Sequence, residues 1–454
     1  MTAPEQRDVA HALLVDLYEL TMVDAYRRKG MADRPATFTL AVRDLPDTRG
    51  YLVAAGLGDV LDWLEGLAFG PDEQEAIERL GVFPPEFVDW LGGLRFTGSV
   101  RAVPEGTIVF GQEPIVEVTA PIGEAQLAET FLLNQVTVQT SLATKAARCR
   151  DAAGSAAVVD FALRRTQGID AGMKLARIGR LVGLAATSNV AGADRYGLPA
   201  SGTMAHAFVQ AYEDETEAFR AFADVYREAT VLLVDTYDTP RGVERAIEVA
   251  REMRERGVEI SGIRLDSGDL AALARDARRT LDDAGFPGLR IIASGGLDEH
   301  KIHRLLHDEH APINGFGVGS ALGVSDDAPV LDSIYKLAAY DGRPVRKTST
   351  GKASWPGAKQ VWRSEDWDHD VLALAEEPAP GPGYQPLLED AMRDGKRTGA
   401  GTASLDEAND HFERHWARLP ARLRRLTDPD AHPVEVSEPM RRLAAEIDAR
   451  NEEL

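Results

Sequence analysis

The feature that most constrains the fold of this 454-residue chain is a unit that repeats after about residue 150. The unit is an apolar run rich in β-branched residues, followed by a polar loop and a charged amphipathic helix. The last four runs recur at intervals of about 25 to 30 residues, the period expected of one strand plus one helix in a parallel βα architecture. The runs are AAVVDFALRR (156–165), TVLLVDTYDT (230–239), EISGIRLDSGD (259–269), LRIIASGGLDE (289–299) and INGFGVGSAL (313–322).

Polar residues at the ends of these runs distinguish between two parallel folds. A doubly wound sheet concentrates functional residues at one or two switch points. A βα barrel instead takes one contribution from each strand at its C-terminal rim. Every run here ends in residues that can do chemistry, namely Arg164, Asp235, Arg264, Asp266, Ser294 and Gly317. The sequence therefore predicts a βα barrel of the α/β class with its site at that rim.

The flanking segments have a different pattern. Residues 1–125 mix helical stretches with short strands separated by Gly and Pro, which is typical of an α+β domain. The barrel is expected over residues 126–345. Residues 346–454 hold a basic stretch, a Pro/Gly-rich linker and a charged helical tail, and we expect them to pack on the other domains.

Composition excludes several classes of protein. With 44% hydrophobic and 27% charged residues, the chain is globular. A net charge of -22 repels nucleic acid and anionic membranes, so neither is an expected partner. No apolar run approaches the roughly 20 residues that span a bilayer, and the N-terminus lacks a signal-peptide layout. We therefore expect a cytoplasmic protein. The single cysteine, Cys149, excludes an intramolecular disulfide and is expected to be inert packing.

Charged residues at the run ends allow two interpretations each. The paired arginines in DFALRRTQG could bind a carboxylate or phosphate in bidentate geometry, or could be solvated. Phe161 beside them could belong to the core or offer a face to a flat ring. Asp269 is explained as the N-cap of the next helix. Asp235 and Asp266 have no such explanation, and could bind Mg²⁺ through water and phosphates or accept hydrogen bonds from ribose hydroxyls. No residue pair marks a dedicated metal site, so the metal ligands stay unassigned.

Glycines and a histidine complete the set. ASGGLDE and GFGVGS place glycines directly after strands, where backbone N–H groups and the next helix dipole can bind phosphate. GFGVGS also resembles part of a dinucleotide fingerprint, but it ends the repeat series instead of opening it. His206 in SGTMAHAF lies at the start of a helix among small residues. It could be a packed or capping histidine, or a base or nucleophile toward phosphorus.

In order and spacing, these motifs together resemble the nicotinate phosphoribosyltransferase family. The resemblance runs from LLVDLYELTM through DFALRRTQG, SGTMAHAF, LLVDTYDT, GIRLDSGDL, IIASGGLDE and GFGVGSAL to YKLAAYDGRPVRKTSTGKASWPG, so it covers nearly the whole chain. It implies an irregular α/β barrel of the type II phosphoribosyltransferases with a flanking α+β domain, in a homodimer with sites at the subunit boundary. The implied reaction makes nicotinate mononucleotide and pyrophosphate from nicotinate and phosphoribosyl pyrophosphate. Mg²⁺ is the expected cofactor, and ATP, hydrolysed in step with the reaction, is the expected co-substrate.

The resemblance also implies residue roles. His206 matches the histidine that ATP phosphorylates. Nicotinate contacts are matched by Tyr18 of the partner subunit, Phe161, Thr203 and Arg264. The lining of the phosphoribosyl pyrophosphate site is matched by Arg164, Asp235, Asp266, Ser294, Gly295, Gly317, Gly319 and Ser320. Two positions depart from the family pattern: Val15 replaces a common threonine and Ala207 a common serine, so hydrogen bonding around the reacting groups can differ.

Three alternatives compete with this interpretation. Nicotinamide phosphoribosyltransferase carries an aspartate in the resembling motif where this chain has Met204, and the absence of that carboxylate favours the acid substrate. Quinolinate phosphoribosyltransferase is shorter and lacks the histidine motif. A non-catalytic sensor of phosphorylated ligands is the third alternative, and the presence of Arg164, His206, Asp235 and Arg264 argues against it.

Overall fold

The computed structural model describes residues 11–349 and 353–452. Two compact units divide the chain: unit 1 comprises Met1–Ser141 and Val330–Leu454, and unit 2 comprises Leu142–Pro329. The three segments expected from the sequence, with boundaries at residues 125 and 345, stay a prediction. Part of the motif KTSTGKASWPG lies outside the described residues.

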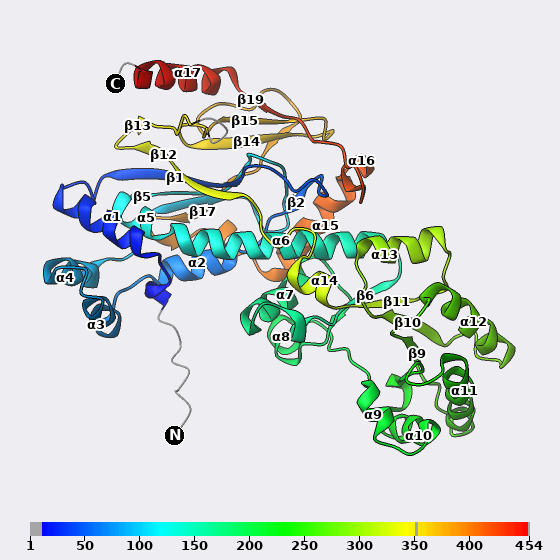
Figure 1. Ribbon diagram of the computed structural model, residues 1–454. Coiled ribbons are helices and arrows are strands. Elements are labelled where there is room, and N and C mark those ends of the chain that lie inside the picture. Colours follow the sequence, from blue (N-terminus) through cyan, green and yellow to red (C-terminus); the bar gives the residue numbers. More distant parts are fainter. Residues whose placement is uncertain (1–10, 350–352, 453–454) are drawn as a thin grey trace. The chain divides into compact units, whose positions relative to one another are not determined.

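Unit 2 contains a parallel sheet, as the repeat predicts (Figure 1). Its strand order is β7-β6-β11-β10-β9-β8, and every neighbouring pair is parallel. The strands are β6 (Ala157–Asp160), β7 (Ala186–Thr187), β8 (Val231–Leu233), β9 (Gly262–Leu265), β10 (Arg290–Ser294) and β11 (Gly315–Val318). Within the described residues β7 and β8 are edge strands that do not pair with each other, which is why the barrel is irregular. The sequence analysis did not predict β7, because a strand of two residues is too short to form an apolar run.

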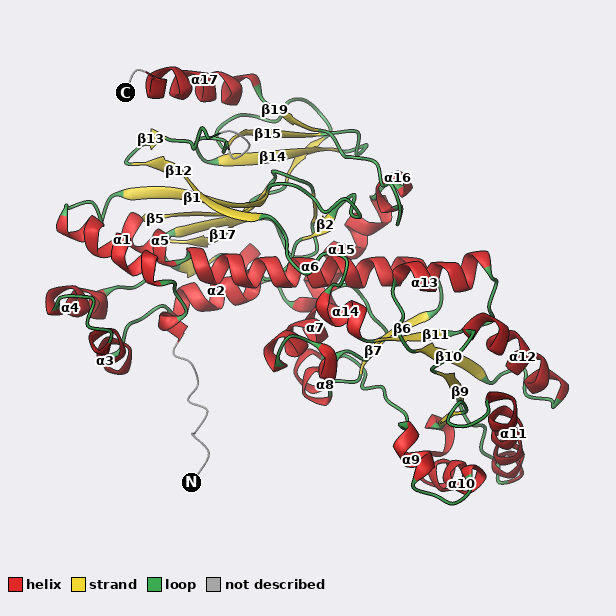
Figure 2. Ribbon diagram, in the orientation of Figure 1, coloured by secondary structure: helices red, strands yellow, loops and turns green. Residues whose placement is uncertain are grey.

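Helices separate the strands of unit 2 along the chain, and Figure 2 shows them in red around the yellow sheet. They are α7 (Ile169–Leu181), α8 (Val190–Tyr196), α9 (His206–Gln210), α10 (Glu215–Tyr226), α11 (Thr239–Glu255), α12 (Leu270–Asp283), α13 (Glu299–His303) and α14 (Ser320–Val324). Sheet and helices enclose an apolar core that includes the fully buried Leu232, Ile263, Ile291 and Phe316.

Two helix starts test the capping expectations. Asp269 caps α12 as predicted, since its side chain accepts a hydrogen bond from the backbone of Ala272 at 3.1 Å. At the start of α11, Thr239 precedes Pro240, and Pro is common at the first helical position, so the sequence predicts Thr239 as the cap; this prediction is wrong. Asp238 is the cap, and its carboxylate accepts from the backbone of Arg241 at 3.1 Å. Pro240 has no N–H to offer, so the bond goes one residue further.

Unit 1 is built on mainly antiparallel sheets, and its largest sheet draws strands from both ends of the chain. Its seven-stranded sheet has the order β13-β12-β1-β5-β3-β17-β18. These strands are β1 (Pro35–Val42), β3 (Ser99–Ala102), β5 (Pro114–Pro121), β12 (Ser333–Tyr340), β13 (Arg343–Pro344), β17 (Glu389–Arg393) and β18 (Lys396–Arg397). A four-stranded sheet contains β14 (Lys359–Ser364), β15 (Asp370–Leu374), β16 (Tyr384–Pro386) and β19 (Val434–Val436), and a two-stranded one contains β2 (Leu52–Val53) and β4 (Ile108–Val109).

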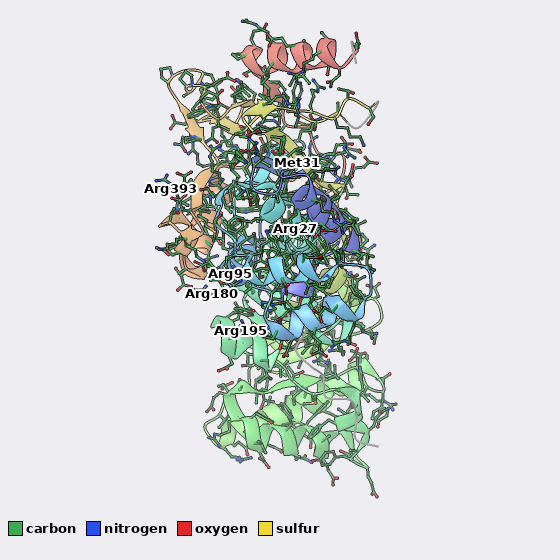
Figure 3. The ribbon with its side chains drawn as sticks, turned by 90° about the vertical axis from the view of Figure 1, so that its left-hand side faces the viewer. Arg27, Met31, Arg95, Arg180, Arg195 and Arg393 are labelled. Carbon is green, nitrogen blue, oxygen red and sulfur yellow. The ribbon has the colours of Figure 1, made fainter. Side chains whose placement is uncertain are left out.

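The helices of unit 1 lie at both ends of the sequence. They are α1 (Leu17–Arg28), α2 (Leu57–Gly66), α3 (Pro71–Arg79), α4 (Pro85–Gly93), α5 (Ile122–Leu127), α15 (Leu405–Arg418), α16 (Ala421–Arg424) and α17 (Glu438–Glu452), and α6 (Glu129–Ala153) crosses the boundary between the units. Arg27 of α1, labelled in Figure 3, lies 5.9 Å from the ring centroid of Phe87 in α4. Among the helices of the described residues, none is long and apolar enough to cross a membrane.

Candidate active site

The carboxyl ends of the parallel strands bring the predicted residues of unit 2 together. Asp160 of β6 pairs in register with Val318 of β11, and Ser294 of β10 pairs with Gly317. Arg264 lies within β9, and Asp266 follows that strand directly. Because parallel strands end at the same edge of a sheet, residues far apart in the sequence line one rim.

Arg264 is a buried cation that is held by uncharged groups. Its residue surface is 9% exposed. Nη1 donates to Oγ1 of Thr203 at 2.5 Å, and Nη2 donates to the carbonyl of Met204 at 3.0 Å. Nε has no hydrogen-bond partner within the described residues. Burial lowers the pKa of Arg264, while Asp266 and Asp235 act in the opposite direction. The site therefore offers a fixed guanidinium that no carboxylate of the described residues contacts.

His206 is the first residue of α9, as the sequence predicts, and both ring nitrogens face other loops. Nδ1 lies 3.1 Å from Oγ1 of Thr236, and Nε2 lies 3.8 Å from Oδ2 of Asp266. The side chain is 39% exposed. The ring is thus oriented by the loops after β8 and β9 while remaining accessible to a reactant. Sequence reasoning missed Thr236, although it directly follows the Asp235 that was singled out.

Asp235 and Asp266 link three successive strand ends. Oδ2 of Asp235 accepts hydrogen bonds from the backbone N–H of Asp266 at 2.8 Å and from Oγ of Ser267 at 2.7 Å. Oδ1 of Asp266 accepts from Oγ of Ser294 at 2.5 Å. Oδ1 of Asp235 is buried and has no partner within the described residues. An orphaned carboxylate oxygen can accept a ribose hydroxyl or bind a cation.

Gly295 lets the loop after β10 approach the loop after β9. Its φ is +92°, and a Cβ there would lie 1.9 Å from the carbonyl oxygen of Asp266. The next carbonyl, that of Gly296, accepts a hydrogen bond from the ammonium of Lys301. The helix that follows, α13, has five residues, as does α14 after the other glycine loop. The helix dipoles therefore contribute less than the sequence suggested, and backbone N–H groups are the main candidates for phosphate contacts.

Phe161 lies over the backbone of β11. A Cβ on Gly317 would lie 2.3 Å from two atoms of the phenyl ring, so only glycine leaves room for it. The backbone N–H of Phe161 donates to the carbonyl of Val318 at 2.9 Å. Gly319 follows, where a Cβ would lie 3.8 Å from the carbonyl oxygen of Phe161, and Ser320 begins α14. The ring is only partly buried, so it retains a face on which an aromatic ligand could stack.

Comparison with known proteins places these residues in a family. Models of the nicotinate phosphoribosyltransferase N-terminal domain, family and C-terminal domain match residues 13–137, 156–338 and 383–444. Nicotinate phosphoribosyltransferase pncB2 of Mycobacterium tuberculosis is 48% identical over 94% of this chain and 92% of its own length. The chain belongs to the nicotinate phosphoribosyltransferase family. The Bacillus subtilis nicotinate phosphoribosyltransferase is 42% identical over 82% of this chain and 78% of its own length.

The fold agrees with that of a solved nicotinate phosphoribosyltransferase. The crystal structure of the human nicotinic acid phosphoribosyltransferase superposes with a TM-score of 0.84 at 28% identity. The match covers 96% of this chain and 100% of the human one. The expected fold class, a βα barrel with a flanking α+β domain, is confirmed.

Arg164 does not lie at the end of a strand, although the sequence predicted that position. β6 ends at Asp160, and Arg164 lies exposed in the short turn Leu163–Arg165. Its charge helps to lower the pKa of Arg264. The strand stops early because Asp160 turns the chain, which the sequence did not reveal. Its Oδ1 accepts from the backbone of Ala162 at 2.8 Å and its Oδ2 from Oγ1 of Thr187 at 2.7 Å.

Asp160 and Thr187 form a fully buried support for the loop that carries Phe161 and Arg164. Burial raises the pKa of Asp160, and its two hydrogen bonds oppose that shift. Tyr18, the remaining aromatic residue of the prediction, lies in α1 of unit 1 and is 45% exposed. Its contribution to a nicotinate pocket stays a prediction. Cys149 is completely buried, as expected of inert packing.

Proposed function

We propose that this chain transfers the phosphoribosyl group of phosphoribosyl pyrophosphate to nicotinate, forming nicotinate mononucleotide and pyrophosphate in the salvage route to NAD. Arg264 carries the proposal. It is a buried guanidinium at the barrel rim, hydrogen-bonded only to Thr203 and Met204 within the described residues. A planar carboxylate ligand is the natural complement of such a group.

The remaining residues fit the two halves of the substrate pair. Phe161 offers a ring face to the pyridine, and Tyr18 of a partner subunit covers the other face in the proposed homodimer. The ring nitrogen of nicotinate bonds to C1 of the ribose as the bond from C1 to the pyrophosphate oxygen breaks. Asp235 and Asp266 accept hydrogen bonds from ribose hydroxyls, and the glycine loops and Arg164 bind the phosphates. Positioning and charge stabilisation then supply much of the rate.

Mg²⁺ fits this site as a companion of the pyrophosphate. In the part of the chain that the structure describes, no cluster of three or more His, Cys, Asp or Glu residues could hold a metal alone. The orphaned Oδ1 of Asp235 could hold the ion together with water and phosphate oxygens. Bound there, Mg²⁺ would neutralise charge on the leaving group. EDTA should abolish activity and Mg²⁺ should restore it, whereas full activity without a divalent ion would contradict the proposal.

We propose further that ATP phosphorylates His206 and that its hydrolysis drives nucleotide formation. The exposed imidazole and its contact with Thr236 support a nucleophile that is oriented and accessible. A phosphoryl group adds roughly two negative charges, and Asp266 lies 3.8 Å away, so arginine or metal must offset them. His206→Ala should abolish ATP hydrolysis and the stimulation by ATP without unfolding the protein. The labelled enzyme should lose its phosphate in acid and keep it in base.

One assay separates the proposed function from its alternatives. Purified protein is given phosphoribosyl pyrophosphate and Mg²⁺ with nicotinate, nicotinamide or quinolinate, with and without ATP. Since the side chain of Met204 offers the amide no acceptor and Arg264 can pair with the acid, nicotinate should be preferred by roughly 30-fold or more. Equal turnover of nicotinamide would overturn the assignment, and binding without turnover would favour the sensor. We expect the enzyme to work in the cytoplasm.

A further inference from the structure

A buried ion cluster in unit 2 surrounds the side chain of Lys145 in α6. The ammonium lies 2.5 Å from Oε2 of Glu299, 2.7 Å from Oδ1 of Asp326 and 3.0 Å from Oδ1 of Asp327. Nε of Arg148 donates to the other oxygen of Glu299 at 3.0 Å. The side chains of Lys145 and Glu299 are 1% and 0% exposed. One buried lysine therefore gathers three carboxylates, of which Glu299 is fully buried and Asp326 is 48% exposed.

The charges of this cluster are retained in the fold. Burial on its own would lower the pKa of Lys145, but Glu299 and the hydrogen-bonded carboxylates raise it above its usual value. Replacing a buried ion cluster by apolar residues of similar volume is often neutral or stabilising. Stability alone is thus a weak reason for such a cluster, and its position in the fold suggests another reason.

The cluster lies at the exits of both glycine loops of the candidate site. Glu299 comes four residues after Gly295 and begins α13, which Asp298 caps by accepting from the backbone of Lys301 at 2.8 Å. Asp326 comes six residues after Ser320, just beyond α14. The loop after β10 and the loop after β11 are therefore tied to the same ammonium on α6.

Helix α14 also contacts the loop after β6. A Cβ on Gly323 of α14 would lie 2.8 Å from the Cβ of Ala162, next to Phe161. A shift of α14 would consequently disturb three loops of the rim together. Backbone N–H groups bind an anion well only when their directions are fixed beforehand, and displacement of a binding group by about 1 Å can cost on the order of 100-fold.

We propose that Lys145 is a positioning residue that fixes both glycine loops in the geometry that binds the phosphates of phosphoribosyl pyrophosphate. Lys145 touches no substrate in this role. It acts through Glu299 on the loop after β10 and through Asp326 on the loop after β11. The inference rests on the proposed function, because it concerns the same site.

The first test compares Lys145→Met with Leu281→Ala, a change in the fully buried part of α12 that leaves the cluster intact. Binding of Mg²⁺-pyrophosphate is measured by calorimetry, and KM is measured separately for both substrates. Lys145→Met should weaken pyrophosphate binding and raise the KM for phosphoribosyl pyrophosphate by about 10-fold or more, with the KM for nicotinate within about 2-fold. Leu281→Ala should lower the melting temperature without separating the two KM values.

If Lys145→Met fails to fold, a second pair of variants with smaller changes still tests the proposal. Asp326→Asn removes one carboxylate from the cluster, and Asp282→Asn removes one from a surface pair with Arg278. The two aspartate side chains are 48% and 49% exposed, so the changes are matched. Asp326→Asn should raise the KM for phosphoribosyl pyrophosphate by roughly 3-fold and speed amide hydrogen exchange in residues 295–299 and 319–325. Asp282→Asn should do neither.

The outcomes separate this inference from the proposed function. If the wild-type protein neither binds Mg²⁺-pyrophosphate nor uses phosphoribosyl pyrophosphate, the proposed function is wrong. If the wild type does both and Asp326→Asn matches it in KM and in hydrogen exchange, the positioning role of the cluster is wrong. Equal rises in both KM values would also overturn it, because a general loss of structure would then explain the effect.

Discussion

The core of unit 1 and the barrel rim of unit 2 each bury an arginine, and the two arginines differ in whether a carboxylate contacts them. Arg363 in β14 has its counter-ion within the fold: Nε lies 3.0 Å and Nη2 2.5 Å from Oδ2 of Asp370. Its guanidinium carbon also lies 4.4 Å from the ring centroid of Trp367. Arg264 in β9 contacts only a hydroxyl and a carbonyl among the described residues. One cation is neutralised, and the other is left for a ligand.

The pKa shifts reflect the same difference between the two arginines. Burial by itself would raise the pKa of Asp370, but Arg363 holds it below its usual value, so this pair stays ionised. Glu113 lies next to the pair, and burial and the charge of Asp370 raise its pKa well above normal. Burial lowers the pKa of Arg264, which no carboxylate in the described part of the chain contacts. A buried charge without its partner costs free energy, and that cost is tolerated where a ligand supplies the partner.

The largest effect should come from breaking the neutralised pair. Arg363→Met leaves Asp370 buried without its cation, and removal of one partner of such a pair costs about 3 to 5 kcal/mol of stability. Urea unfolding should show this loss. The molecules that remain folded should keep their KM for nicotinate, because the pair belongs to the core of unit 1.

A double variant sharpens that test. Arg363→Met combined with Asp370→Leu removes both charges, so it should recover about half or more of the lost stability. No recovery would mean that Arg363 stabilises the core mainly through its contacts with Phe110 and Trp367, at 5.1 and 4.4 Å from their ring centroids.

The reverse pattern is expected at the rim. Arg264→Lys keeps a charge but loses the planar fork, so catalytic efficiency toward nicotinate should fall by about 2 to 4 kcal/mol, roughly 30-fold to 1000-fold. Stability should change by less than about 1 kcal/mol, since no buried counter-ion is stranded. Steady-state kinetics and thermal melting measure the two quantities. A large loss of stability with unchanged kinetics would remove the distinction between the two arginines.

The sequence identified Arg264 but not the role of Arg363, and the reason is distance along the chain. Arg264 falls at the end of an apolar run that repeats with the period of a βα unit, so its position alone placed it at the rim. Arg363 lies in a stretch whose basic composition predicts no particular contact for it. Its contacts with Ile108 and Glu113 span about 250 residues, and only the folded sheet brings these together.

Local irregularity explains the other features that the sequence did not predict. The sequence predicted the strands within the five apolar runs and His206 at a helix start. It missed β7, Asp160 and Thr236, because a two-residue strand has no period and a buried loop-supporting aspartate looks like any strand-end acid. The pairing of β12 with β1 links residues about 300 apart and was likewise out of reach.

Backbone geometry at the rim gives the next effect in size. Gly295→Ala should cost about 2 to 3 kcal/mol of stability or raise the KM for phosphoribosyl pyrophosphate by a comparable factor, because φ is +92° and the Cβ would meet Asp266 at 1.9 Å. Gly296→Ala is the matched control, with φ +62° and its nearest neighbour, Nζ of Lys301, at 3.7 Å. It should cost only about 1 kcal/mol. Equal effects of the two changes would mean that the close approach to Asp266 does not matter.

The smallest effect, measured at pH 5.5 to 6, concerns Glu19 in unit 1, a buried acid that has no counter-ion among the described residues. Its side chain is completely buried, and Oε1 accepts hydrogen bonds from the backbone and hydroxyl of Thr130 at 2.8 and 2.6 Å. Oε2 has no partner within the described residues. Burial raises the pKa of Glu19 from 4.5 to about 8. Unlike Arg264, this group can become neutral, so the fold meets the cost of burial by retaining a proton.

The sign of the pH dependence follows from that shift. Below pH 4.5 the carboxyl is protonated in both the folded and the unfolded chain, and its contribution to stability is fully present. Between pH 4.5 and about 8 the unfolded chain releases the proton while the folded chain keeps it, so this stability is lost as the pH rises.

Glu19→Gln imitates the neutral acid at every pH. It should be more stable than wild type by about 1 to 2 kcal/mol at pH 5.5 to 6, at about 1.4 kcal/mol per pH unit above the unfolded pKa, and equally stable at pH 4. Glu75→Gln, at a side chain 67% exposed, should show no such divergence. Urea titrations of the three proteins from pH 4 to 9 measure the difference, in which all other titrating groups cancel. Parallel curves for Glu19→Gln and wild type would show that Glu19 is ionised in the fold. The contrast between a buried acid that is neutral and a buried arginine that stays charged would then be wrong.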